Sequence, residues 1–148
     1  MDLLKNVKIR RLEKGDLEAI VEIDAKILGE KRRDYWEARL SGLDERSSQA
    51  SLVAELSGEV IGFILGDISG WEFGVPDTIG WIETVGIDPG YQKKGIARAL
   101  AGELIQNLKA IGVMTIYTLV NWDDWDLLQF FHAIGFTRGD MINLELKI

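Results

Sequence analysis

The sequence predicts an α/β (α+β) domain with one mixed, mostly antiparallel central sheet and helices on both of its faces. Apolar stretches at 52–56, 60–68 and 79–87 follow one another without an intervening helix, which is typical of an antiparallel meander. A long amphipathic pattern then separates 79–87 from the apolar stretch 114–120, which indicates a crossover between parallel strands. The length of 148 residues fits one domain, so we expect a single domain over 1–148.

The N-terminal part supplies one strand and two helices. Alternation from Val7 to Leu12 predicts the first strand. An apolar stripe then predicts a helix with its N-cap at Gly15-Asp16 and its end at Gly29; its members are Leu17, Ile20, Val21, Ile27 and Leu28. A weaker helix pattern spans Arg33 to Leu40, and the polar run 44–49 predicts a surface loop.

The remaining elements alternate between strands and helices. Ser57-Gly58 predicts a hairpin turn between strands 52–56 and 60–68, and a loop over 70–77 precedes strand 79–87. The best-patterned helix ends at Gly112, and its apolar face consists of Ile96, Leu100, Leu104, Leu108 and Ile111. Further elements are expected at 114–120 (strand), 125–133 (helix ending at Gly135) and 142–148 (strand).

Composition excludes several classes of protein. With no cysteine and one histidine, we expect no disulfide framework, no thiolate chemistry and no metal site. The net charge of -7 disfavours a nucleic-acid partner and favours a cationic one. Without a long apolar run or a secretory segment, we expect no membrane partner and a cytoplasmic location. Five tryptophans make a homodimer reasonable.

The segment from Gln92 to Arg98 predicts an anion site. The first turn of a helix has backbone N–H groups without intrahelical acceptors, and Lys93 and Lys94 add positive charge just before it. Gly95 and Ala97 are small enough to let phosphates approach the backbone. The alternative is an ordinary Pro-Gly turn with solvated lysines.

The motif Gln-x-x-Gly-x-Ala at Gln92, Gly95 and Ala97, preceded by Asp88-Pro89-Gly90-Tyr91, fits neither a Walker loop nor a dinucleotide fingerprint. It resembles the acetyl-CoA loop of the GNAT superfamily of N-acetyltransferases. The element order is similar to the GNAT fold over nearly the whole chain. The stretch 130–136, which ends in a Gly-Phe pair, also resembles the last helix of that family.

The resemblance implies that acetyl-CoA is the cosubstrate and that strands 79–87 and 114–120 splay apart around its pantetheine arm. Backbone groups of Val85, Gly86 and Ile87 would pair with the arm, and an N–H near Val85 would polarise the acetyl carbonyl. Asn121 or Asp124 would hydrogen-bond the arm, although Asp124 is equally explained as an N-cap with Trp125 entering the core. The cofactor-binding residues of the loop would be Gln92, Lys93, Lys94, Gly95, Ile96, Ala97 and Arg98.

Glu83 is the candidate catalytic base. An amine with a pKa near 10.4 is almost entirely protonated at neutral pH, so a group must remove its proton before it can attack. Alternation places Glu83 on one strand face with Ile79, Trp81, Val85 and Ile87. A carboxylate on an apolar face is costly unless it is paired or used. The alternatives are a structural ion pair and an exposed carboxylate at the edge.

Other candidate groups stay open at this point. Where the family often has a tyrosine as general acid, this chain has Phe131, and Tyr91 and Tyr117 are weak substitutes. Asp24 lies within an apolar stripe and would either line the acceptor groove or form an internal pair. An aromatic and acidic loop would suit a cationic acceptor; it contains Trp71, Glu72, Phe73 and Asp77.

The predicted function is acetyl transfer from acetyl-CoA to a primary amine. The amine would be a protein N-terminus, a lysine, a polyamine or another small amine. Because no cysteine is present to carry an acyl group, we expect direct attack in a ternary complex. The alternative, motivated by Phe131, is a non-catalytic acyl-CoA-binding sensor or subunit.

Overall fold

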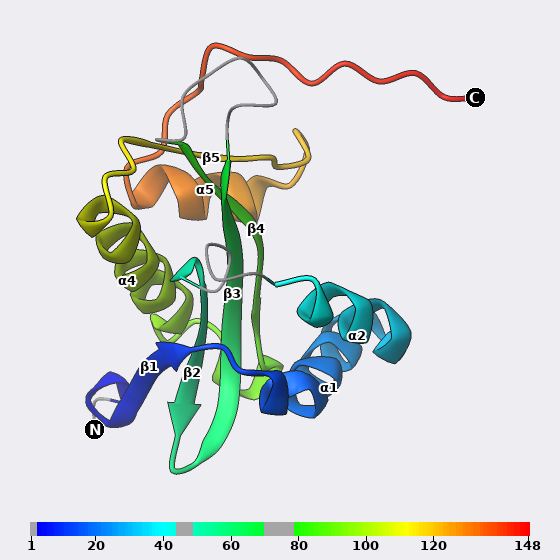
Figure 1. The fold of residues 1–148 in the computed structure, drawn as a ribbon, viewed down its shortest axis with the longest axis vertical. Helices are drawn as coiled ribbons and strands as arrows, with labels where there is room; N and C mark the ends of the chain where they lie inside the picture. Colours follow the sequence, from blue (N-terminus) through cyan, green and yellow to red (C-terminus); the bar gives the residue numbers. More distant parts are fainter. Residues whose placement is uncertain (1–2, 44–48, 70–78) are drawn as a thin grey trace. The chain divides into compact units, whose positions relative to one another are not determined.

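The computed structural model describes residues 3–43, 49–69 and 79–148 (Figure 1). Two compact units are distinguished along the chain, Met1–Thr118 and Leu119–Ile148. The first unit holds the sheet and most of the helices, and the second holds one helix and the C-terminal segment.

The first unit is built on a five-stranded sheet in the order β1-β2-β3-β4-β5. Neighbouring strands from β1 to β4 are antiparallel, whereas β5 is parallel to β4. The strands are β1 (Val7–Arg11), β2 (Ser51–Leu56), β3 (Glu59–Ser69), β4 (Ile79–Ile87) and β5 (Thr115–Thr118). The predicted mixed sheet with its parallel crossover is confirmed.

Helices cover both faces of this sheet, as predicted. Helices α1 (Leu17–Leu28) and α2 (Arg33–Ser41) lie on one face, and α4 (Ile96–Ala110) lies on the opposite one (Figure 1). Short 3-10 segments are η1 (Leu3–Asn6), η2 (Lys14–Asp16) and η4 (Pro89–Tyr91). No helix in the described ranges is long and apolar enough to cross a bilayer.

Local turn chemistry explains where several elements end. Ser57 and Gly58 both have positive φ (51° and 81°), the geometry of a tight hairpin turn. Gly29 has φ 90° and ends α1, as predicted. Asp16, by contrast, does not cap α1 with its side chain, because its carboxylate accepts from Arg10 and from the backbone N–H of Glu13.

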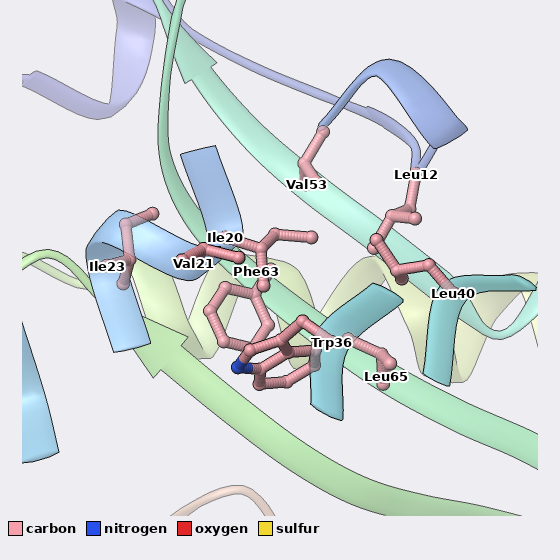
Figure 2. Packing of buried hydrophobic residues seen from close by; sticks show 9 residues of the cluster. All are labelled: Leu12, Ile20, Val21, Ile23, Trp36, Leu40, Val53, Phe63 and Leu65. Carbon is pink, nitrogen blue, oxygen red and sulfur yellow. The ribbon is translucent and has the colours of Figure 1, made fainter. Parts of the chain in front are cut away.

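The core between the sheet and α1 and α2 is centred on Trp36 and Phe63. Their rings meet edge to face with centroids 5.3 Å apart, and both side chains are buried (Figure 2). The other members of this cluster are Leu12, Ile20, Val21, Ile23, Leu40, Val53 and Leu65. This packing fixes α2 against β3. The side chain of Glu83 lies on the same face of the sheet, as described below.

A β-bulge interrupts β4 at Glu83. Thr84 pairs with Leu65 and Ile82 pairs with Gly66, so Glu83 has no opposite residue on β3. Gly66 is required there, because a Cβ at that position would lie 2.4 Å from the carbonyl oxygen of Trp81.

The bulge overturns one expectation about strand faces. Simple alternation put Glu83 on one face with Val85 and Ile87. The register instead pairs Ile87 with Gly62, and a Cβ on Gly62 would meet the side chains of Ile87 and of Ile96 in α4. Val85 and Ile87 therefore face α4, whereas Glu83 faces α2. The extra residue of a bulge shifts the alternation by one position, which sequence periodicity does not reveal.

The second unit contains α5 (Trp125–Ala133), which ends before Gly135 with φ 106°. The expected strand at 142–148 is not formed: residues 141–148 have neither helix nor strand structure. A strand forms only when another strand supplies its hydrogen-bonding partners, a long-range contact that periodicity does not reveal. The expected burial of Trp125 is also wrong, since its side chain is 69% exposed.

Candidate active site

The end of the parallel pairing between β4 and β5 creates a fork in the first unit. The two strands pair from Ile79 to Ile82 on β4, and the hydroxyl of Thr118 donates to the carbonyl of Ile82 at 2.9 Å. Beyond this point β5 ends, while β4 continues to Ile87. The edge of β4 from Glu83 onward is therefore not used by β5, which leaves backbone groups for an extended ligand.

Glu83 lies at this fork and is paired with Arg39. The guanidinium of Arg39, on α2, contacts the Glu83 carboxylate; the two side chains are 28% and 38% exposed. The predicted alternative of an ion pair is thus what the structure contains. A carboxylate that is half-exposed and held by a cation from another element can exchange that cation for another one.

Aromatic side chains lie beside Glu83 on the same face. Trp81 and Tyr117 are direct partners across β4 and β5, with ring centroids 5.3 Å apart. Tyr117 precedes Thr118, the last residue of β5, so this aromatic pair lies next to the end of the parallel pairing. Tyr91 lies in η4, at the other end of β4.

Packing in the core requires a glycine at position 86, which the sequence did not reveal. A Cβ at Gly86 would lie 2.6 Å from Cζ of Phe63, so the Phe63 ring occupies the space that a side chain would need. Gly86 was expected to pair with a bound arm through its backbone. In this structure it leaves room for the core on the α2 side of the sheet.

The loop after β4 is folded around Asp88. The Asp88 carboxylate accepts from the N–H of Gly90 at 2.9 Å and from Nζ of Lys26, on α1, at 2.8 Å. The side-chain amide of Gln92 donates to the carbonyl of Ile87 at 3.1 Å. Gln92 thus closes the loop back onto the end of β4.

Lys26 was not predicted as part of this loop. Its hydrogen bond holds the pKa of Asp88 below the ordinary value, against the effect of burial and with help from the N–H of Gly90. Lys26 and Asp88 are 62 positions apart, and no sequence pattern links them.

The N-terminus of α4 presents backbone donors beside cations. Lys93 and Gly95 have φ 63° and 87°, and the first helical bond runs from the N–H of Ala99 to the carbonyl of Gly95. The N–H groups of 96–98 precede that bond, so helix geometry gives them no intrahelical acceptor. Lys93, Lys94 and Arg98 are exposed, whereas Ile96 is buried and can offer only its backbone. This set of donors fits a pyrophosphate.

The expected residues of the second unit have structural partners. The Asp124 carboxylate accepts from the N–H of Leu127 at 3.2 Å and therefore caps α5, and the carbonyl of Asn121 accepts from the N–H of Asp124. Phe131 is buried, and its ring packs edge to face against Phe130 and Phe136.

Two further expectations concern the acceptor side. Asp24 forms an internal pair, because the Arg32 guanidinium donates two hydrogen bonds to its carboxylate at 2.9 and 3.0 Å. The hydrogen bond from Arg32 lowers the Asp24 pKa despite partial burial. The aromatic and acidic loop with Trp71, Glu72, Phe73 and Asp77 lies outside the described residues.

Comparisons with known proteins agree with this geometry. Residues 17–136 match the model of the acetyltransferase (GNAT) family. An uncharacterized N-acetyltransferase from Methanocaldococcus jannaschii is 22% identical over 99% of this chain and 68% of its own length.

Solved structures share the fold. The ribosomal-protein-S18-alanine N-acetyltransferase from Escherichia coli superposes with a TM-score of 0.75, at 22% identity over 90% of this chain and 79% of that one. The aminoglycoside N-acetyltransferase AAC(6')-Iy in complex with CoA superposes with a TM-score of 0.80, at 16% identity over 95% and 94%. The family match spans both units and includes the fork, the loop and α4. The chain therefore belongs to the GNAT family of acetyltransferases, enzymes that transfer acetyl groups.

Proposed function

We propose that this protein transfers the acetyl group of acetyl-CoA to a primary amine, with Glu83 as the base. The observation that carries the proposal is the position of Glu83 at the bulge of β4, where β5 ends. The same strand leads directly into the anion-binding turn before α4. One continuous segment thus holds the proposed catalytic carboxylate and the proposed cofactor cradle.

The cofactor would lie along this segment. The free edge of β4 at Val85, Gly86 and Ile87 would pair with the pantetheine arm. The pyrophosphate would be held by the helix N-terminus and its cations, with contributions from Gln92, Lys93, Lys94, Gly95, Ile96, Ala97 and Arg98. Acetyl-CoA supplies an activated acetyl thioester when bound. Asn121 and Asp124 remain proposed contacts to the arm, although the Asp124 carboxylate is engaged as an N-cap.

The residues of the chain would handle the proton and the charge. Glu83 accepts a proton from the acceptor ammonium, and the neutral nitrogen then attacks the acetyl carbon. A C–N bond forms, the C–S bond breaks, and the thiolate leaves with the electron pair of that bond. The second proton of the attacking nitrogen then passes to the thiolate, directly or through water, to give the free thiol. The N–H of Val85 would stabilise the negative charge that develops on the carbonyl oxygen.

We propose a small cationic amine as the acceptor class. Glu83 already accepts one cation, Arg39, and the net charge of the chain is -7. Related folds include acetyltransferases named for aminoglycosides, which are polycationic amines, and for an alanine of a ribosomal protein. The ion pair between Arg39 and Glu83 supports the cationic class, because it shows that the partly exposed Glu83 carboxylate can hold a cation.

The decisive experiment measures free thiol released from acetyl-CoA with a panel of amines. We expect Glu83→Gln to lower kcat by about 10²-fold or more, with loss of the acid limb of its pH profile. Glu37→Gln is the matched control, because Glu37 is an exposed glutamate of α2 paired with Arg33. Near-normal turnover of Glu83→Gln would refute the assignment of Glu83 as the catalytic base. If acetyl-CoA binds and no amine releases thiol, the chain is an acyl-CoA-binding sensor or subunit instead.

A further inference from the structure

The parallel pairing between β4 and β5 ends in a hydrogen bond made by a side chain. Thr118, the final residue of β5, donates from its hydroxyl to the carbonyl of Ile82 at 2.9 Å. Ile82 and Thr118 are register partners as well, the last of the pairs that begin with Ile79 and Thr115. The hydroxyl thus acts on the last carbonyl of the paired part of β4.

Ladder geometry shows what this hydroxyl replaces. In a parallel ladder, a carbonyl that points toward the neighbouring strand accepts from the N–H one position beyond its register partner. The carbonyl of Ile82 points toward β5, because it accepts from Thr118, so the donor of a continued ladder would be the N–H of Leu119. The Thr118 hydroxyl takes the place of that N–H, and β5 ends there while β4 continues to Ile87.

Packing holds the paired part of the two strands on both faces of the sheet. On one face, the rings of Trp81 and Tyr117 lie with their centroids 5.3 Å apart. On the other face, a Cβ at Gly80 would lie 2.8 Å from Cδ1 of Leu108 in α4, so the helix lies close against the backbone. The bulge at Glu83 directly follows. The Thr118 hydroxyl therefore lies between pairing that is held by packing and the start of the fork.

We propose that Thr118 is a positioning residue for the cofactor: its hydroxyl stops the β4–β5 ladder at Ile82 and keeps the edge of β4 from Val85 to Ile87 available to the pantetheine arm. The inference rests on the proposed function, because acetyl-CoA must lie along this edge. It adds to that function the side chain that sets where the arm can begin to pair. Without the hydroxyl, the Ile82 carbonyl accepts the N–H of Leu119, and the ladder lengthens toward the edge that the arm needs.

Calorimetric titration with two ligands tests this role. CoA carries the arm, whereas adenosine bisphosphate is the nucleotide part of CoA without it. Thr118→Val keeps a β-branched side chain that favours a strand but removes the donor, and Thr118→Ser retains the hydroxyl. We expect the Kd for CoA to rise about tenfold in Thr118→Val and to stay within about threefold in Thr118→Ser. The Kd for adenosine bisphosphate should be the same in both variants as in the unaltered chain.

Thr115→Val is the matched control for this titration. Thr115 begins β5 and pairs with Ile79, at the end of the ladder away from the fork, so the same chemical change should leave both Kd values unaltered. An unchanged Kd for CoA in Thr118→Val, or an equal rise for both ligands, would overturn the role of Thr118. Failure of the unaltered chain to bind CoA would overturn the proposed function itself.

Hydrogen exchange of the ligand-free protein tests the end of the ladder separately. In Thr118→Val the exchange of the Leu119 amide should slow about fivefold or more, because its N–H becomes bonded to the Ile82 carbonyl. In Thr118→Ser and Thr115→Val it should exchange as in the unaltered chain. An unchanged rate at Leu119 in Thr118→Val would show that the hydroxyl does not stop the ladder and would overturn the proposal.

Discussion

The guanidinium of Arg39, in the last turns of α2, is paired with the carboxylate of Glu83 at the bulge of β4. α2 is held in place by Trp36, which packs on Phe63 of the sheet. The core thus positions a cation against the proposed catalytic base. A cationic acceptor of the proposed class would compete with Arg39 for the Glu83 carboxylate.

Removal of Arg39 is expected to favour cationic acceptors. Arg39→Ala should lower the KM for a cationic amine about fivefold, because a partly exposed ion pair contributes at most about 1 kcal/mol and this contribution opposes binding. The check is steady-state kinetics with one cationic amine at saturating acetyl-CoA. Arg33→Ala is the control, since Arg33 is on the same helix and pairs with Glu18 and Glu37. A higher KM in Arg39→Ala would show that Arg39 supports binding instead.

The lack of space at Gly86 should appear as a loss of stability. Gly86→Ala should lower the free energy of unfolding by about 1–3 kcal/mol, because the new Cβ would meet the Phe63 ring at 2.6 Å. Gly102→Ala is the matched control. Gly102 lies within α4 with no atom within 4 Å of an added Cβ, so alanine should stabilise the protein by about 0.5–1 kcal/mol. Urea unfolding of both variants tests the pair, and equal signs would contradict the packing argument.

The hydrogen bonds of Asp88 should matter for cofactor binding. Asp88→Asn removes the charge that holds Lys26 and Gly90, so we expect the turn before α4 to loosen and the Kd for CoA to rise about tenfold. Calorimetric titration with CoA measures this. Lys31→Met disrupts the exposed pair with Glu22 and should leave the Kd unchanged. An unaltered Kd in Asp88→Asn would separate Asp88 from the cofactor site.

Acid should destabilise the fold through three buried aspartates. Hydrogen bonds from Arg32 and Lys26 lower the pKa of Asp24 and Asp88, and at Asp16 those from Arg10 and the Glu13 N–H outweigh burial, which alone would raise it. Groups with a lowered folded-state pKa stabilise the protein above their unfolded value of 3.8. This stabilisation is lost as the pH falls through the folded-state values.

The measurement is the free energy of unfolding as a function of pH. It should show no loss from these three groups down to about pH 5 and a decrease below about pH 4. Asp24→Asn should have lower stability at neutral pH and a shallower decrease in acid, because one of the three titrating groups is gone. An acid decrease as steep as that of the unaltered chain would exclude Asp24 as a contributor.

Much of the fold follows from short-range patterns in the sequence. The stripe of α4, the left-handed glycines at its boundaries and the turn at Ser57-Gly58 depend on residues a few positions apart. The structure agrees with them except at Ile111, which was expected in the stripe but follows the end of α4 and is 48% exposed. The motif from Gln92 to Arg98 is local as well, and it identified the family correctly.

Contacts between distant parts of the chain decided the rest. The bulge at Glu83 depends on pairing with β3 across a segment outside the described residues, and it reverses the faces of Val85 and Ile87. Arg39 reaches Glu83, and Lys26 reaches Asp88, only because α1 and α2 pack on the sheet.

The C-terminal segment shows the difference between what the sequence pattern determines and what tertiary contacts determine. Its alternation is a property of the sequence, which determined that 142–148 suits a strand. Whether a strand forms depends on an edge that supplies hydrogen bonds, and residues 141–148 have neither helix nor strand structure. Periodicity specifies which face of an element is apolar, while tertiary contacts specify what covers that face, because burial depends on residues that are far apart along the chain.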